Sequence, residues 1–207
     1  MQITVNETDM KIEGNRLVIN INSDLGKVLG LNKVVLSSVK PGDIINDKYI
    51  VLEHFESGAT AVIRKELLEK TMDFGDSNND WRSSNVRNYL NNEYLKDVEK
   101  EFGADSIVEH MVDLLSMDGL DDYGSSRDKI SLLTIDQYRK YRKILGDNMK
   151  NWWWLATPDS TPSGWSTGYV RCVDSSGGVC YDGYICDGGV RPFFILKSSI
   201  FVSSPRD

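Results

Sequence analysis

At 207 residues, with 40% hydrophobic and 27% charged residues, the chain has the size and composition of one soluble globular domain with at most a small appendage. Its formal net charge of −7 disfavours binding to nucleic acid or to anionic membranes, because such partners require a basic surface. The N-terminal residues show no basic region and no long apolar run, and no stretch approaches the length of a membrane helix. We therefore expect no signal peptide, no membrane insertion and a cytoplasmic location at synthesis, with export inside a virion left open.

The first part of the chain differs in pattern from the rest. Residues 1–39 alternate polar and apolar positions between Asn and Gly, which predicts short strands joined by turns. We treat them as an N-terminal extension or docking segment, separate from a ligand-binding domain over residues 40–207. Within that domain, residues 44–52 and 60–63 are predicted strands.

A helical region is predicted next. Ser83 or Ser84 can cap a helix whose apolar residues recur at helical spacing through Phe102. Residues 107–115 form another apolar-faced segment of this region, and residues 117–128 read as a polar loop.

A second helix follows a short apolar segment. Residues 130–133 are typical of a buried strand, and Thr134–Gln137 fits a capping box. Tyr138, Tyr141 and Leu145 would form the inner face of the helix that begins there.

The last quarter of the chain combines apolar ends with a polar middle. Trp152, Trp153 and Trp154 precede residues 159–187, which are rich in Gly, Ser, Asp and Tyr. Residues 169–173 and 179–181 are predicted as paired strands, and residues 190–196 as a further strand. Strands before and after helices indicate an α+β fold.

Several residues have both a structural and a functional interpretation. The tryptophans at 152–154 could stack on a sugar, but alternation along a strand favours at least two of them as core residues. Arg191 could bind an anion, although a structural arginine that bonds loop carbonyls is favoured. Trp81 and Arg82 are interpreted as a packing and capping feature.

No metal or cofactor site is predicted. The histidines, His54 and His110, lie far from the cysteines, which argues against zinc, and no catalytic Ser/His/Asp order or phosphate-binding glycine loop is present. The aspartates of residues 118–122 are interpreted as a solvated acidic loop rather than a calcium site. We expect no catalytic residues and no enzymatic activity.

The cysteines lie close together in the polar window. The chain has an odd number of cysteines: Cys172, Cys180 and Cys186. In a chain without a secretion signal, this predicts free thiols rather than disulfides.

Four motifs carry a resemblance to a known family. Trp81–Asn91, Asp128–Thr134, Trp153–Pro158 and Gly189–Pro192 are similar, in order, to W-x-x-S-x-[LV]-R-x-[WY]-L-N, D-K-[IV]-F-L-L-S, W-W-L-[RA]-[ST]-P and G-V-R-P of an uncharacterised bacterial and phage domain family. The resemblance spans residues 40–197.

That family resembles the C-type-lectin-like fold of the formylglycine-generating enzymes, which implies short strands, two or more helices and a long loop-rich C-terminal part. Related domains are variable proteins of diversity-generating retroelements, whose C-terminal codons are rewritten. The resemblance implies a non-catalytic receptor-recognition protein of a phage or prophage, located on a virion or bacterial surface. Its partner would be a host cell-surface protein or glycan, and it could form a homo-oligomer or a phage tail component.

Two alternatives remain open: a structural or assembly protein of a phage particle, and an oxidase like the formylglycine-generating enzymes, in which Cys180 and Cys186 would form the reactive pair. For ligand contact we expect seven residues: Trp165, Tyr169, Arg171, Tyr181, Tyr184, Cys186 and Asp187. Tyr169 and Arg171 would share one face of a strand with Val173, while an ordinary polar loop is the competing interpretation.

Overall fold

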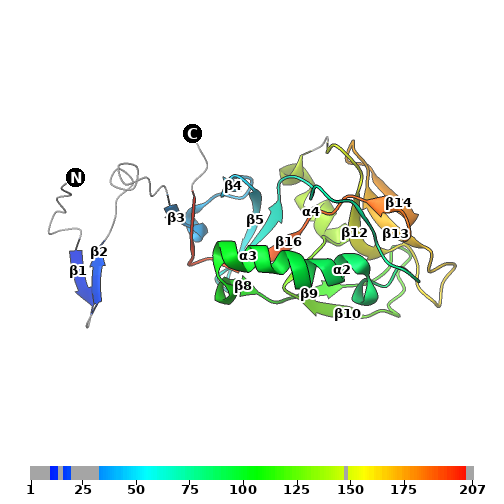
Figure 1. The fold of residues 1–207 in the computed structure, drawn as a ribbon, viewed down its shortest axis with the longest axis horizontal. Helices are drawn as coiled ribbons and strands as arrows, with labels where there is room; N and C mark the ends of the chain where they lie inside the picture. The colour runs from blue at the N-terminus through cyan, green and yellow to red at the C-terminus, as the bar shows by residue number, and fades with distance from the viewer. Residues whose placement is uncertain (1–9, 14–15, 20–32, 147–148, 204–207) are drawn as a thin grey trace.

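The computed structural model describes residues 10–13, 16–19, 33–146 and 149–203 (Figure 1). Parts of the predicted N-terminal segment, at residues 1–9, 14–15 and 20–32, lie outside the described residues. The strands are β1 (Met10–Glu13), β2 (Arg16–Ile19), β3 (Lys33–Val35), β4 (Ile44–Ile45), β5 (Tyr49–Phe55), β6 (Ala59–Arg64), β7 (Met72–Asp73), β8 (Ile107–Val108), β9 (His110–Asp113), β10 (Ser125–Asp128), β11 (Ile130–Ser131), β12 (Trp153–Pro158), β13 (Tyr169–Val173), β14 (Val179–Gly183), β15 (Asp187–Gly188), β16 (Phe193–Lys197) and β17 (Phe201–Ser203). The helical segments are η2 (Leu36–Ser38), η3 (Trp81–Ser83), α2 (Asn85–Tyr89), η4 (Leu90–Tyr94), α3 (Leu95–Phe102), η5 (Ala104–Ser106) and α4 (Ile135–Leu145).

An antiparallel sheet forms the centre of the domain. Its strand order is β11–β16–β6–β5–β4, and β8 also pairs with β16. Successive side chains of β5 enter different hydrophobic cores, because neighbouring residues of a strand point to opposite faces. Val51 packs in the core that contains the helix α2–η4–α3, whereas Ile50 and Leu52 pack in the core that contains α4. The sheet is therefore buried on both faces.

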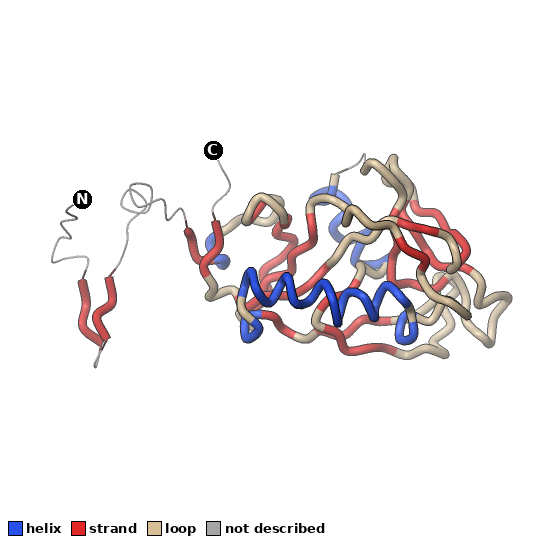
Figure 2. Tube along the Cα trace, viewed as in Figure 1, coloured by secondary structure: helices blue, strands red, loops and turns tan. Residues whose placement is uncertain are grey.

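The long helix runs along one face of this sheet (Figure 2). Its segments α2, η4 and α3 are continuous, and the Ser84 hydroxyl caps its start by accepting a hydrogen bond from the Arg87 backbone N–H. The middle segment is a π-helix, where the Asn91 side chain donates to the Ile130 carbonyl at 2.8 Å and accepts from the Ile130 N–H. Gly103, at a φ of 86°, ends the helix. The predicted helix through Phe102 is thus present.

A buried carboxylate joins the start of this helix to β10. Asp128 is 3% exposed and accepts hydrogen bonds from Trp81 Nε1 at 2.8 Å and from Ser126 Oγ at 2.6 Å. Arg87 Nε donates to its other oxygen at 2.7 Å, and the same two side chains form an ion pair. Trp81 itself is fully buried, which confirms its interpretation as a packing residue.

The helix α4 covers the opposite face of the sheet. Thr134 and Gln137 form the predicted capping box, in which the Thr134 hydroxyl accepts from the Gln137 N–H and the Gln137 side chain accepts from the Thr134 N–H. Tyr138, Tyr141 and Leu145 are buried, as their spacing predicts.

The predicted α+β class with a C-type-lectin-like fold and two or more helices is wrong. Antiparallel strands in several small sheets dominate the described residues, which are only 22% helical and include one continuous helix of 18 residues besides the shorter α4. Part of the error lies at residues 107–115. The sequence pattern places them in the helical region, whereas in the structure they contain β8 and β9. Burial in β9 alternates residue by residue, the period of a strand. The expected loop at 117–128 also ends in a strand, β10, which pairs with β9.

The beginning and the end of the described domain lie side by side. Within the expected N-terminal segment, β3 pairs with β17, with Val34 opposite Val202. Leu36, directly after β3, is fully buried in the core, and its backbone N–H donates to the Ile200 carbonyl. Residues 33–39 are therefore built into the domain at this end.

The prediction of three free thiols is wrong for two of the cysteines. Cys172 of β13 and Cys180 of β14 form a disulfide, and Cys186 is free. The strand register places the two cysteines directly opposite each other with Cα atoms 4.9 Å apart, which brings their sulfurs within bonding reach. The odd cysteine count reflects one disulfide and one thiol.

We predict that a reducing agent lowers the free energy of unfolding by about 2.5 kcal/mol, because opening this short loop returns chain entropy to the unfolded state. Urea denaturation with and without the reductant measures the difference. The Cys186→Ala variant should behave like the wild type, while Cys172→Ala/Cys180→Ala should be insensitive to reductant. Titration of three thiols in the unreduced, unfolded protein would contradict the disulfide.

A buried histidine at the start of β9 contacts β11. His110 is 8% exposed, its Nε2 is 2.8 Å from Ser131 Oγ, and its ring lies edge-on to Phe193. Burial lowers the pKa of His110 to about 4, although the nearby charge of Asp128 acts in the opposite direction.

We predict that this histidine makes the fold sensitive to mild acid. Below about pH 6.5 the histidine of the unfolded chain binds a proton, whereas in the folded chain it stays neutral down to about pH 4. Protonation therefore favours the unfolded chain, and the free energy of unfolding falls by about 3 kcal/mol as the pH is lowered through this window. Denaturation curves at several pH values measure the slope, and His110→Gln should flatten it. An unchanged slope in the variant would assign the acid sensitivity to other groups.

Candidate functional site

The candidate site is built on β12, which carries two of the consecutive tryptophans. Trp153 is 1% exposed and packs in the core around α4, while Trp154 is fully buried in the core on the other side. Gly188 is needed beside Trp154, because a Cβ atom there would lie 2.5 Å from Trp154 Nε1. At least two tryptophans are therefore core residues, as predicted, and they form a rigid floor.

Arg191 also supports this floor. Its side chain is buried and donates hydrogen bonds to the carbonyls of Arg64 and Lys65 at 3.0 and 3.1 Å. Its guanidinium lies 5.2 Å from the Trp153 ring centroid. The predicted structural role for Arg191 is confirmed.

The strands β13 and β14 form a hairpin that extends β12 into a three-stranded antiparallel sheet, with β13 in the middle. The register places Tyr169 opposite Gly183 and Arg171 opposite Tyr181, while Val170 and Cys172 lie on the other face. The predicted strand at 169–173 and its pairing with 179–181 are confirmed. Asp174 organises the turn by accepting from the backbone N–H groups of Ser176 and Gly178, and Gly177 supplies a φ of 83°.

Three aromatic side chains meet on the outer face of this hairpin. Trp165, Tyr169 and Tyr181 are 61%, 36% and 55% exposed, and we call them the aromatic face. Trp165 stacks on Tyr169 with ring centroids 5.4 Å apart, and Tyr181 lies edge-on to Tyr169 at 5.4 Å. The fold thus brings together three of the seven predicted contact residues.

Arg171 supports the aromatic face from the side. Its side chain is only 13% exposed, and its Nη1 forms an ion pair with Asp159 Oδ1 at 2.7 Å. The guanidinium lies 5.6 Å from the Tyr181 ring centroid. The structure therefore places Arg171 as a support for Tyr181, with little surface left for a ligand.

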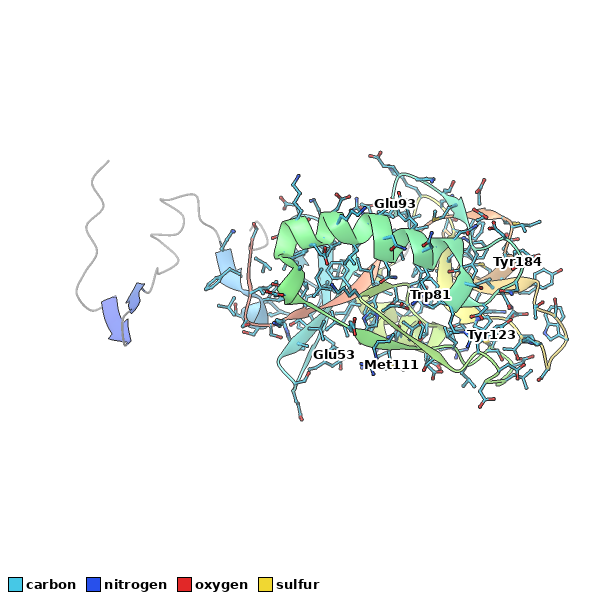
Figure 3. The ribbon with its side chains drawn as sticks, turned by 60° about the horizontal axis from the view of Figure 1, so that its bottom comes forward. Glu53, Trp81, Glu93, Met111, Tyr123 and Tyr184 are labelled. Carbon is cyan, nitrogen blue, oxygen red and sulfur yellow. A yellow bond between two sulfur atoms is a disulfide. The ribbon has the colours of Figure 1, made fainter. Side chains whose placement is uncertain are left out.

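The loop that carries Trp165 is anchored by Asn79, which the sequence analysis missed. Asn79 is fully buried, and its side-chain amide donates to the carbonyls of Ser160 at 2.9 Å and Tyr169 at 2.7 Å. The Tyr123 hydroxyl donates to the Asn79 Oδ1 at 2.8 Å. Tyr123 and Tyr184 lie at the same end of the domain in Figure 3.

A second anchor comes from the acidic loop at 118–122. Asp122 accepts hydrogen bonds from the Thr161 hydroxyl at 2.7 Å and from the Ser163 N–H at 2.7 Å. These bonds lower the pKa of Asp122, and a hydrogen bond from Ser116 lowers that of Asp118. Both carboxyl groups are therefore ionised at neutral pH, directly beside the Trp165 loop.

The other predicted contact residues lie at the corner after β14. Tyr184 and Cys186 are half-buried and pack against the core, and Asp187 is exposed with its backbone paired to Asp73 of β7. A hydrogen bond to Asp182 raises the pKa of the Cys186 thiol, which makes the thiol a poor nucleophile. Ile185, which the sequence analysis did not single out, is 70% exposed here.

The described residues that could take part in metal binding or catalysis are accounted for as follows. No group of three His, Cys, Asp or Glu side chains there is arranged to hold a metal ion. His54 Nδ1 lies 2.8 Å from Thr60 Oγ1, which lies 2.7 Å from Ser198 Oγ, but Thr60 of β6 and Ser198, directly after β16, are both buried. Cys180 is bonded to Cys172, so it is not a free partner for Cys186.

None of the helices in the described ranges is long and apolar enough to span a membrane.

Comparisons with known proteins find one domain family that is similar to part of the chain. Residues 108–198 are similar to a domain of unknown function, DUF6273, and this stretch contains β12, the hairpin and all seven predicted contact residues. No curated protein matches the chain. No solved structure matches it either.

Proposed function

We propose that this chain is a non-catalytic recognition protein that binds its ligand through the aromatic face. The observation that carries the proposal is the contact of three large, exposed rings, Trp165, Tyr169 and Tyr181, on one side of a hairpin. Tyrosine and tryptophan supply much contact area at little cost in side-chain entropy, and they are the residues that dominate binding surfaces.

The rings are held in place before a ligand arrives. Asn79 and Asp122 anchor the Trp165 loop, the ion pair of Arg171 with Asp159 supports Tyr181, and the Cys172–Cys180 disulfide joins the two strands. A preorganised surface loses less conformational entropy on binding, which favours affinity. Rigid supports under exposed rings therefore fit a binding surface better than they fit a surface without function.

The position of the face in the domain also fits recognition. The strands β3 and β17 pair at one end, whereas β13 and β14 lie at the other (Figure 1). An assembly attached near β3 and β17 would leave the aromatic face free. The resemblance implies such a mounting, on a virion as a tail component or on a bacterial surface, with a partner on a host cell.

We predict that Trp165→Ala and Tyr181→Ala each weaken binding to the target by about 2 kcal/mol, roughly thirtyfold in Kd. Labelled protein applied to panels of bacterial cells and to protein and glycan arrays identifies a target, on which the variants are then compared. Phe201→Ala is the matched control, since Phe201 is a 64% exposed ring at the opposite end, on β17.

Equal loss in the Phe201 variant, or full binding by both aromatic variants, would contradict the assignment. A stable oligomer that binds no target and tolerates exchange of residues 159–187 would instead support the structural or assembly role.

The composition of residues 159–187 supports a narrower hypothesis, that of a variable protein diversified by a retroelement. Cys172 and Cys180 do not support this hypothesis, because their disulfide holds the hairpin together. The exposed residues Tyr169, Tyr181 and Ile185 do support it, since their side chains can change without disturbing the core.

We predict that sequencing this gene across a natural population finds substitutions concentrated at those three exposed positions. The buried Val170 and the Cys172–Cys180 pair should stay constant, because replacing them would cost stability. Substitutions spread evenly over exposed positions of the whole chain would rule out targeted diversification.

A further inference from the structure

The net negative charge of the chain lies in the two segments that form and anchor the aromatic face. Residues 113–122 contain four aspartates and no basic residue, and residues 159–188 contain four aspartates and one arginine. These two segments together carry a net charge of −7, which equals that of the whole chain, so the rest of the chain is neutral on balance. They are also the segments that form and anchor the Trp165 loop and the hairpin.

The two segments are in direct contact. Besides the bonds from Asp122 to Thr161 and Ser163, the Met117 N–H donates to the Pro158 carbonyl at 3.0 Å. The acidic loop therefore lies beside the Trp165 loop. Charges that lie within about 8 Å of one another, the Debye length at physiological salt, act together on a ligand.

Two arginines close to the face are paired with aspartates. Arg171 is paired with Asp159, and Arg82, whose guanidinium lies 5.5 Å from the Tyr123 ring centroid, is paired with Asp80. Hydrogen bonding keeps Asp118, Asp122 and Asp174 charged by lowering their pKa values. A ligand at the aromatic face thus meets a negative potential.

We propose that the partner at the aromatic face is a basic protein surface, one that presents Lys or Arg among apolar side chains. This inference rests on the proposed recognition function and names its partner class. Lys and Arg place their apolar stems on aromatic rings and their charges over the ring faces, where the ring quadrupole attracts a cation. The acidic segments add long-range attraction that speeds association.

The pairing of Arg171 with Tyr181 is an internal example of the same contact. Tyr181 remains 55% exposed beside it, so part of the ring is open to a second cation from a partner. Anionic glycans and nucleic acids would be repelled by the same charges, and a neutral glycan would gain nothing from them.

The test uses the whole protein and three fluorescein-labelled peptides that differ in one respect. The first contains Lys and Tyr among Ser and Gly, the second has Glu in place of every Lys, and the third has Ser in place of every Lys. Fluorescence anisotropy should show binding of the Lys peptide only. Its affinity should fall at least fivefold as NaCl is raised from about 50 to about 300 mM, because salt screens the attraction.

Two double variants distinguish attraction by carboxylates near the aromatic face from attraction by the overall charge of the protein. Asp121 and Asp187 are exposed, and Asp121→Asn/Asp187→Asn should weaken binding of the Lys peptide roughly fivefold. The control Glu56→Gln/Asp105→Asn removes the same charge from exposed positions outside the two acidic segments and should leave binding unchanged. Tyr181→Ala should abolish binding of the Lys peptide.

Equal weakening by the control pair, or equal binding of the Glu or Ser peptide, overturns the basic partner. The proposed function fails separately, when Trp165→Ala and Tyr181→Ala leave binding to the cell or array target intact. If those variants lose the target while the Lys peptide shows no binding, the recognition function stands and the partner class is wrong.

Discussion

The hydrogen bonds to the buried carboxylate of Asp128 are the interactions on which the domain most depends. It joins the Trp81 indole, the first turn of the long helix through Arg87, and Ser126 of β10. Removing the carboxylate would leave a buried indole N–H and a partly buried guanidinium without their acceptor, which costs far more than the loss of an exposed ion pair. The helix start in turn follows Asn79, the residue that anchors the binding loop, so the core network and the candidate site are joined by a few residues of chain.

Local signals in the sequence were sufficient for some elements and insufficient for others. The capping box at Thr134 and the hairpin strand at 169–173 depend on neighbouring residues, so residue type and spacing revealed them. The strands within 107–115 are short and pair with distant partners, and two or three apolar residues cannot distinguish a strand from a helix turn. The fold class was missed for the same reason, since small sheets depend on long-range pairing.

The candidate site shows the same division. Exposed aromatic residues could be chosen from composition, and three of them meet as a face. Their supports could not be foreseen, because Asn79 and Asp122 reach the Trp165 loop from about 40 or more residues earlier in the chain and look like ordinary loop residues. Arg171 is expected on the same face as Tyr169, yet its pairing with Asp159 leaves it largely buried. A short polar side chain gives no sequence signal that it anchors a distant loop.

The hairpin is held at three points along its length. The Tyr138 hydroxyl of α4 donates to the Gly177 carbonyl in the turn at 2.7 Å, the disulfide joins the strands in the middle, and the Asn79 amide holds the Tyr169 carbonyl at the far end. A surface fixed in this way cannot adapt its backbone to a partner. Association with a partner of matching shape should therefore follow simple one-step kinetics, and differences between partners should appear in the dissociation rate.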